Sequence, residues 1–562
     1  MVKRILSFVG REINGLHEAA YLLAGSAFLS LLLALVRDRL LASSFGAGDA
    51  LDVYYAAFRV PDTLFVTVAS LVSTSILVPF LLERKEKGED VLKQAIDGLF
   101  SVFSVIIIVV SLVAFALMPY LMKWLFPEIA AGEYGHELIN LSRVILLSPI
   151  FLGISNFFAS ITQIRGRFLV YAISPLLYNV GIIFGIVCLY PLWGLSGLGL
   201  GVVLGAFAHA LIQVPFVVKD RLFPKLKIKI DWLLVRNIFA LSIPRTITLG
   251  SQQLTALALV SFASFLGAGA ISVFTLSQNL QSVPLSLIGV SYSAAAFPIL
   301  ARAIAEGNTR TFIEKTVQAS RHIIFWSIPL SVLFIVLRAQ IVRTVLGAGE
   351  FDWSDTRLTA AALALFIVSA VAQGLVLLFV RAFYAEGKTS KPLVLNAISA
   401  ICTVIVSYLL IKIFYAYPTF AYFIESMMKT EGVGGSVILM LPLAFSIGAI
   451  VNVILHWYTL SHEFSEFTGS IVRAIFQSLG ASIIGGFAAY QSLRYFDNIF
   501  DLTTAFGIFF QGLCAGLFGI AVITCVLFLM KNPELNQAIA VFKQKVWRVG
   551  TVPVSDAGEP HV

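Results

Sequence analysis

Long apolar runs alternate with short polar segments along almost the whole chain. A helix needs roughly 20 apolar residues to cross the hydrocarbon core of a bilayer, which is about 30 Å thick. Because lipid cannot satisfy exposed backbone N–H and C=O groups, each long run is expected to be one helix. The pattern predicts an all-α membrane protein with about 14 transmembrane helices. They are expected at 18–42, 52–82, 97–123, 138–163, 168–191, 195–218, 237–265, 270–301, 319–346, 358–384, 391–415, 434–460, 470–494 and 503–530.

The composition agrees with this pattern. Hydrophobic residues make up 59% of the 562 residues and charged residues only 12%, whereas charged residues make up about 25% of an average soluble domain. Such a chain cannot cover a water-facing surface, so a soluble multidomain protein is excluded.

The basic residues are distributed unevenly between the two ends of the predicted helices. With the N-terminus placed in the cytoplasm, 27 of the 39 Lys and Arg residues lie on the cytoplasmic side and seven on the opposite side. Cytoplasmic loops of membrane proteins carry the excess of Lys and Arg, so both termini are predicted to be cytoplasmic. The net charge of +8 is thereby explained by topology, and no nucleic-acid partner is expected.

Two stretches resemble each other, FGAGDALDVYYAAFRVP (45–61) and LGAGAISVFTLSQNLQSVP (266–284). They are about six helices apart, an even number, so both copies share one orientation. This favours two six-helix lobes in a parallel repeat plus two C-terminal helices; chance recurrence of glycine turns and prolines is the alternative. The predicted organisation is an interfacial amphipathic helix (1–17), an N-lobe (18–218), a basic cytoplasmic linker (219–236), a C-lobe (237–460), two further helices (470–530) and a cytoplasmic amphipathic helix and tail (531–562).

Arg37, Asp52 and Arg59 lie within or beside the first two predicted helices. An arginine or aspartate at the centre of a span costs about 2.5–3.5 kcal/mol, so such residues usually face a protein interior or a water-filled cavity. Arg37 and Asp52 flank a tight glycine turn and are expected to pair. Arginine binds phosphate oxygens in bidentate fashion, so this group suits a phosphate or pyrophosphate ligand. The alternatives are that the arginines extend to the lipid headgroups and that Asp52 caps the second helix.

Three further residues are candidate ligand contacts. Arg245 lies about two turns in from the cytoplasmic face on the seventh helix and is one candidate for lining an inner cavity. Gln278 and Asn279 occur where the repeat places Arg59; such amides join helices or hydrogen-bond sugar hydroxyls. The chain contains no P-loop, GxSxG, HExxH or Cys/His metal spacing. We therefore expect no enzyme, no metal site and no cofactor.

The segment LVRDRLLASSFGAGDALDVYYAAFRVP (35–61) resembles the MurJ/MviN family of bacterial lipid II flippases, a branch of the multidrug and polysaccharide-lipid exporters. At these positions the family has an arginine–aspartate pair, an FGAG turn, an aspartate and an F-basic-x-P element. VLGAGEFDWSDT (345–356) and, more weakly, AFPILARAIAEGN (296–308) resemble two other segments of that family.

This resemblance implies a transporter of the bacterial plasma membrane. The expected activity moves a polyprenyl-pyrophosphate-linked peptidoglycan precursor from the inner to the outer leaflet by alternating access. Arg37, Asp52 and Arg59 match motif positions of the family, and the last two helices would form a groove for the lipid tail. The implied partners are a lipid-linked oligosaccharide substrate, membrane lipids and cell-wall synthesis proteins.

Leu31, Phe65 and Asn279 stand where the family often has arginine, so a less cationic cavity is expected. Two other functions stay open at this point. One is an exporter of another lipid-linked glycan or of a drug, and the other is a non-transporting scaffold for cell-wall assembly.

Overall fold

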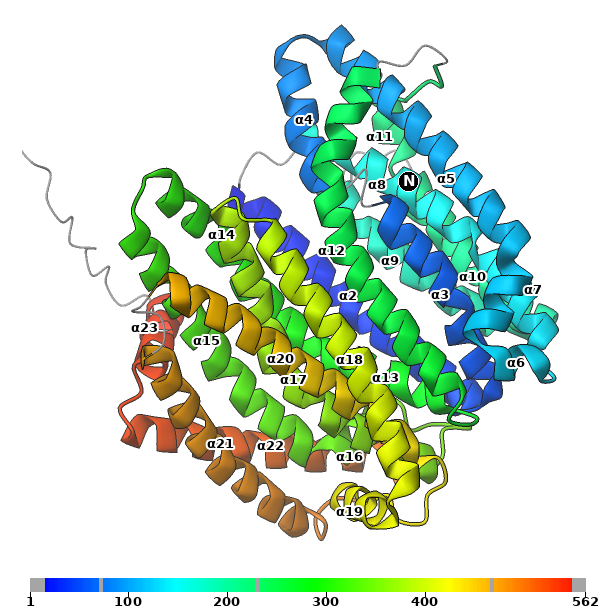
Figure 1. Cartoon of the computed structure of the whole chain (residues 1–562). Coiled ribbons are helices and arrows are strands. Elements are labelled where there is room, and N and C mark those ends of the chain that lie inside the picture. Colours follow the sequence, from blue (N-terminus) through cyan, green and yellow to red (C-terminus); the bar gives the residue numbers. More distant parts are fainter. Residues whose placement is uncertain (1–15, 70–73, 228–231, 465–468, 548–562) are drawn as a thin grey trace, which may run out of the picture. The chain divides into compact units, whose positions relative to one another are not determined.

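The computed structural model describes residues 16–69, 74–227, 232–464 and 469–547, and within these ranges the regular structure is helical throughout (Figure 1). Most of the predicted interfacial helix at 1–17 and the tail after residue 547 lie outside the described residues. The chain forms two compact units. They comprise Met1–Val283, Val342–Ser369 and Gly387–Leu455, and Pro284–Ile341, Ala370–Glu386 and His456–Val562.

The first unit contains most of the helices. These are α2 (Leu16–Phe45), α3 (Asp49–Ala69), α4 (Thr74–Glu86), α5 (Glu89–Leu125), α6 (Pro127–Ala131), α7 (Gly135–Ile145), α8 (Leu147–Ile164), α9 (Phe168–Phe184), η2 (Gly185–Leu189), α10 (Tyr190–Leu211), α11 (Val214–Lys219), α12 (Trp232–Ser264), α13 (Ala270–Pro284), α18 (Ser390–Ala416), α19 (Pro418–Met428) and η4 (Ser436–Leu439).

The second unit contains η3 (Leu285–Val290), α14 (Ser291–Ala305), α15 (Thr309–Val336), α21 (Gly469–Phe496), α22 (Ala505–Leu529) and α23 (Pro533–Trp547). Three helices are divided between the two units, namely α16 (Arg338–Val345), α17 (Trp353–Ala385) and α20 (Met440–Glu463), and the last residue of α13, Pro284, also belongs to the second unit.

The described helices correspond to the apolar runs of the sequence. Ten helical stretches among the described residues are long and apolar enough to cross a membrane. One of them, Phe168–Lys219, covers two predicted spans. The two spans are separated at Trp193 and Gly194, where the backbone leaves helical geometry. The remaining predicted spans coincide with α2, with α3 and α4 together, and with α12. The prediction of an all-helical membrane protein is confirmed.

Glycines allow α9 and α10 to pack side by side (Figure 1). A side chain on Gly181 would overlap the backbone of Gly205, and a Cβ on Gly185 would lie 2.7 Å from the Cα atom of Gly201. Lipid provides no hydrophobic force between helices, so close backbone contact at small residues carries much of the association energy. The contacts of Gly181 in α9 and of Gly185 in η2 with α10 therefore fix the position of α9, which lines the site described below.

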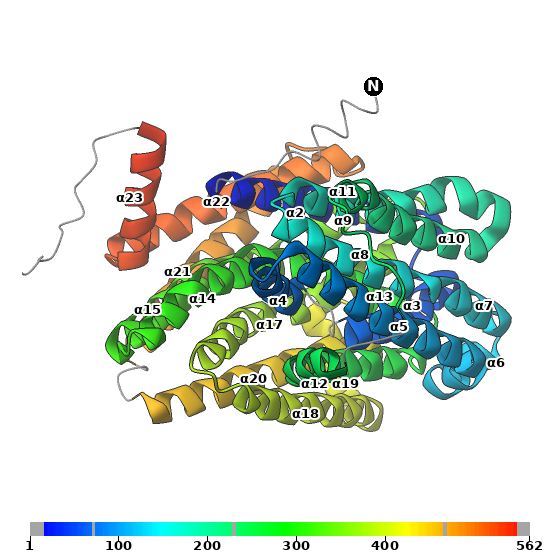
Figure 2. The same ribbon diagram turned by 90° about the horizontal axis from the view of Figure 1, so that it is seen from above.

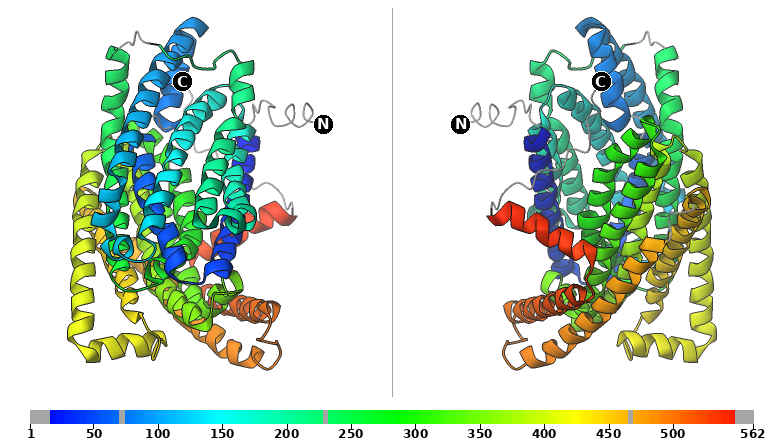
Figure 3. Two further views of the ribbon diagram at one scale, coloured as in Figure 1. Left: turned by 90° about the vertical axis from the view of Figure 1, so that its right-hand side faces the viewer. Right: turned by 90° about the vertical axis from the view of Figure 1, so that its left-hand side faces the viewer.

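Between α18 and α19 of the first unit, the chain changes direction at a proline. α18 ends at Ala416, Tyr417 is extended (φ −124°, ψ 93°) and Pro418 begins α19. The residue before a proline is disfavoured in helical geometry. α19 consequently leaves α18 at a steep angle (Figure 3).

The second unit is built on α21 and α22, a hairpin that packs against α15 (Figure 2). Its core includes Leu333 of α15, Ile523 of α22 and Leu535 of α23, all less than 9% exposed. Glu534 also anchors α23, since its carboxylate lies 2.5 Å from the Arg321 guanidinium. The C-terminal helix is thus attached to this unit by both apolar and ionic contacts.

Candidate functional site

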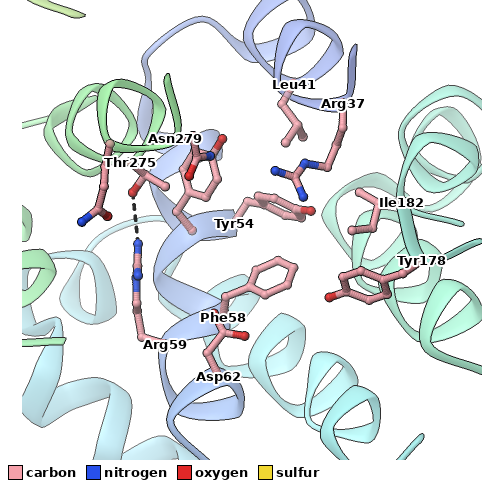
Figure 4. Close-up of a pocket in the computed structure, with 12 residues that line it drawn as sticks. Arg37, Leu41, Tyr54, Phe58, Arg59, Asp62, Tyr178, Ile182, Thr275 and Asn279 are labelled. Carbon is pink, nitrogen blue, oxygen red and sulfur yellow. Dashed lines mark hydrogen bonds between the residues drawn. The ribbon is translucent and has the colours of Figure 1, made fainter. Parts of the chain in front are cut away.

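A cavity of about 280 Å³ lies within the first unit, between α2, α3, α9 and α13 (Figure 4). Four of the six predicted site residues line it, namely Arg37, Arg59, Gln278 and Asn279. The other lining residues are Leu41, Tyr54, Tyr55, Phe58, Asp62, Tyr178, Ile182 and Thr275. The cavity therefore combines two guanidinium groups, one carboxylate, neutral polar groups and aromatic rings.

Arg37 is held by three hydrogen bonds. Its Nε and Nη2 atoms donate to Oδ1 of Asp38 at 2.9 and 2.7 Å, and its Nη1 atom donates to Oδ1 of Asn179 at 3.3 Å. The other oxygen of Asp38 accepts from Nδ2 of Asn279 at 3.0 Å. This network joins α2, α9 and α13, and it neutralises the charge of Arg37 with a carboxylate that is only 3% exposed.

Asp52 does not pair with Arg37, so that prediction is wrong. Its Oδ1 atom accepts hydrogen bonds from the backbone N–H of Ser272 at 2.7 Å and from the Ser272 hydroxyl at 2.5 Å. Ser272 lies in the first turn of α13, where backbone N–H groups have no partner within the helix. Asp52 therefore caps α13 from α3 and lines a second cavity, of about 420 Å³, rather than the one that contains Arg37.

Arg59 is the less satisfied of the two cavity arginines. Its Nη2 atom donates to Oγ1 of Thr275 at 3.1 Å (Figure 4), while its Nε atom is buried without a hydrogen-bond partner among the described residues. In the view of Figure 4 the rings of Tyr54 and Phe58 separate it from Arg37. Arg59 is thus a half-buried cation whose Nε atom has unused hydrogen-bonding capacity.

The structure adds Asp62 and Tyr178 to the site. Asp62 has a sequence signal, since it follows Arg59 by three residues and residues at that spacing share a helix face. Tyr178 lies on α9 and has no such signal, because only helix packing brings it to the cavity.

The remaining predicted site residues differ in their positions. Asn279 bonds to Asp38 and Gln278 faces the cavity. Arg245 lies on α12, and its side chain is outside the part that the structure describes.

Three Gly-Ala-Gly turns meet, at 46–48, 267–269 and 347–349, and the second of them contributes to the lining of the 420 Å³ cavity that contains Asp52. They connect α2 to α3, α12 to α13, and α16 to α17. We call this contact the GAG joint. A side chain on Gly269 would overlap the carbonyl oxygen of Ala47, so only glycine permits this approach.

Hydrogen bonds hold the GAG joint together. The N–H of Ala47 donates to Oδ2 of Asp355 at 2.9 Å, and the N–H of Glu350 donates to the carbonyl of Ser43 at 3.0 Å. Arg39 donates to the carbonyl of Thr344 at 2.6 Å, so this bond ties α2 to α16. The joint holds together the ends of α2, α3 and α13. These are the helices that carry Arg37, Arg59 and Thr275.

The arrangement suits the binding of a ligand. Among the described residues that line the cavity, none is a nucleophile with an adjacent base. Among the described residues, no group of three or more His, Cys, Asp or Glu side chains is placed to hold a metal ion. Ionisable residues that face a cavity among membrane-length helices usually mark the pathway of a substrate or an ion.

Solved structures place the chain in one transporter fold. The structure resembles a lipid II flippase MurJ in an inward closed conformation, with a TM-score of 0.72 at 20% sequence identity, covering 91% of this chain and 100% of that one. It also resembles an inward-facing multidrug resistance transporter of the MATE family, with a TM-score of 0.63 at 17% identity, covering 78% of this chain and 96% of that one.

Sequence comparison identifies the family. The family model described as lipid II flippase MurJ matches residues 41–511. A lipid II flippase MurJ from Burkholderia cenocepacia is 24% identical over 67% of this chain and 75% of its own length. A probable lipid II flippase MurJ from Thermotoga maritima is 28% identical over 65% of this chain and 73% of its own length. The chain belongs to the MurJ lipid II flippase family, a family of multi-pass, non-enzymatic membrane transporters, as a divergent member.

Proposed function

We propose that this protein flips a polyprenyl-pyrophosphate-linked peptidoglycan precursor of the lipid II type from the inner to the outer leaflet of a bacterial plasma membrane. The N-lobe (18–218) and C-lobe (237–460) would alternate access to the cavity, joined by the linker 219–236. The helices of 470–530 would hold the polyprenyl chain, and both termini would be cytoplasmic. Family membership and the charged cavity support this proposal.

Arg59 is the observation that carries the proposal. Arg59 is half-buried, and its buried Nε atom has no hydrogen-bond partner among the described residues. Such a guanidinium is stabilised by an anionic ligand, and pyrophosphate supplies several acceptor oxygens. A hydrogen bond to a charged group contributes about 1.5–3 kcal/mol. Loss of one such contact corresponds to roughly a 10- to 150-fold loss of affinity, since 1.36 kcal/mol is a factor of ten.

The other predicted residues have supporting roles in this proposal. Arg37 presents a second positive group, oriented by Asp38 and Asn179. Gln278 and Asn279 would contact the sugar, and Asp52 would keep the start of α13 in place so that these amides face the cavity. Arg245 would contact the headgroup on its cytoplasmic approach.

A rescue experiment tests the proposal. A bacterium depleted of its own lipid II flippase receives this chain, or its Arg37→Ala, Arg59→Ala or Arg310→Ala variant, and outer-leaflet lipid II is measured. Arg310→Ala is the matched control, because that side chain is 87% exposed and its one ion-pair partner among the described residues is Glu314 on its own helix. We expect rescue by wild type and the control, and loss of rescue without either cavity arginine.

Two results would contradict parts of the proposal. Full rescue by Arg37→Ala or Arg59→Ala at normal membrane levels would remove these residues from the substrate site. Failure of the wild-type chain at normal membrane levels would reject lipid II as the substrate and favour another lipid-linked glycan.

A further inference from the structure

Asp62 is a carboxylate inside the cavity that the proposed binding of an anion does not use. It lies on α3, three residues after Arg59, and lines the cavity together with Arg59 and Arg37. Among the described residues it has no hydrogen bond and no ion pair within 4.0 Å. Asp38 provides the contrast, since it accepts hydrogen bonds from both Arg37 and Asn279. Asp62 is therefore the carboxylate that lines the cavity without a hydrogen-bond or ion-pair partner among the described residues.

The charges around the cavity cancel before a ligand enters. Asp38 balances Arg37, and Asp62 balances Arg59 at longer range. A pyrophosphate diester adds two negative charges, which would then lie in a poorly solvated space with the Asp62 carboxylate. Nearby like charges favour the neutral form of a carboxyl group. A protonated carboxyl also gains an O–H that can donate to a phosphate oxygen.

We propose that Asp62 takes up one proton when the pyrophosphate enters the cavity, so that substrate binding is coupled to protonation of this side chain. The proton comes from bulk water, bonds to a carboxylate oxygen of Asp62, and returns to water when the substrate leaves. Asp62 thereby determines at which pH the cavity accepts an anion. The inference rests on the proposed function, because it requires a pyrophosphate ligand beside Arg37 and Arg59.

The other groups around Asp62 do not supply this proton linkage. α2 presents Arg37 and its paired Asp38, α3 presents Arg59, Tyr54 and Tyr55, and α9 presents Tyr178. Arginine remains charged in proteins, and tyrosine ionises only near pH 10. The residues that α13 presents, Thr275, Gln278 and Asn279, are neutral.

Calorimetry on the full-length protein in detergent micelles tests the coupling directly. The probe is a short-chain, water-soluble polyprenyl pyrophosphate ester of N-acetylmuramic acid amide, a pyrophosphate diester without other ionisable groups. Titration between pH 6 and pH 9 in two buffers with different ionisation enthalpies gives the number of protons taken up per bound probe. The proteins are wild type, Asp62→Asn, Asp62→Glu and, as the matched control, Asp49→Asn. Asp49 is an exposed carboxylate on the same helix that lies outside the Arg37 cavity.

At pH values where the free carboxyl is ionised, we expect wild type, Asp62→Glu and Asp49→Asn to take up about one proton per probe, and Asp62→Asn to take up none. Wild-type affinity should fall by up to about tenfold per pH unit while the free carboxyl is ionised, as one linked proton requires. The affinity of Asp62→Asn should be independent of pH and should exceed that of wild type at pH 9.

The outcomes separate the two proposals. Equal proton uptake by wild type and Asp62→Asn would overturn the role of Asp62, as would pH-independent binding by wild type; both leave the pyrophosphate site intact. Absence of probe binding by both wild type and Asp62→Asn would overturn the proposed function, and this inference with it.

Discussion

Replacing Gly269 with alanine should destabilise the GAG joint without changing any charge or polar contact. Gly269 has a φ of +79°, and an added Cβ would overlap the carbonyl oxygen of Ala47 in the neighbouring turn. Gly387 is the matched control. Its φ is +74°, and a Cβ there would meet no atom within 4 Å. The two substitutions therefore share the backbone strain and differ in the contact between turns.

The expected magnitudes follow from that difference. An L-residue in the left-handed region costs about 1–2 kcal/mol, which applies to both variants. Overlap in a tightly packed contact adds roughly 1–3 kcal/mol, which applies to Gly269→Ala alone. The gain from restricting the unfolded chain, about 0.4–1 kcal/mol, is the same for both and cancels. We expect Gly269→Ala to lower the free energy of unfolding by about 1–3 kcal/mol more than Gly387→Ala does.

Equilibrium unfolding of the purified protein in mixed detergent micelles measures these free energies. Wild type, Gly269→Ala and Gly387→Ala would be followed under identical conditions by helical circular dichroism. Equal destabilisation by the two variants would refute the reasoning, because it would mean that the turns separate without cost and that the joint contributes nothing to stability.

Two further predictions concern helix packing away from the cavity. Gly181→Ala should push α9 from α10 and lower the free energy of unfolding by about 1–3 kcal/mol, whereas Gly98→Ala, in open space on α5, should change it by less than about 1 kcal/mol; similar losses would contradict the glycine contact. In a double-mutant cycle, Arg321→Ala should destabilise more than Glu534→Ala, because it leaves a carboxylate that is only 5% exposed without its partner, while Arg321 is 29% exposed and can reach water. The coupling energy should be about 0.5–3 kcal/mol, and a value near zero would show that this pair does not hold α23.

The helices of this protein can be predicted from its sequence with good agreement. Each predicted span corresponds to a described helix or group of helices, from α2 to α22. The reason is that bilayer thickness sets the length of an apolar run directly, with no contribution from tertiary contacts. The motif at 35–61 likewise indicates the family, and the presence of Arg37 and Arg59 inside apolar runs is enough to predict that both line a cavity.

The partners of these charged residues cannot be predicted in this way. The short turn predicts that Asp52 faces Arg37, but Asp52 instead binds Ser272, which is 220 residues away in the chain. Asp62 and Tyr178 face the cavity because of how α3 and α9 are rotated about their axes, and apolar run length carries no information on rotation.

The order of residues along the chain is therefore sufficient to identify the segments that cross the membrane and the charges that must be sheltered from lipid. Which groups meet depends on the packing of the helices. Helices in lipid associate through close packing of small residues and interhelical hydrogen bonds. Gly181 of α9 makes such a contact within a helix, and Gly269 of the GAG joint makes one in the turn between two helices. Those contacts set the depth and rotation of each helix, and with them the balance of Arg37, Asp38, Arg59 and Asp62 around one cavity.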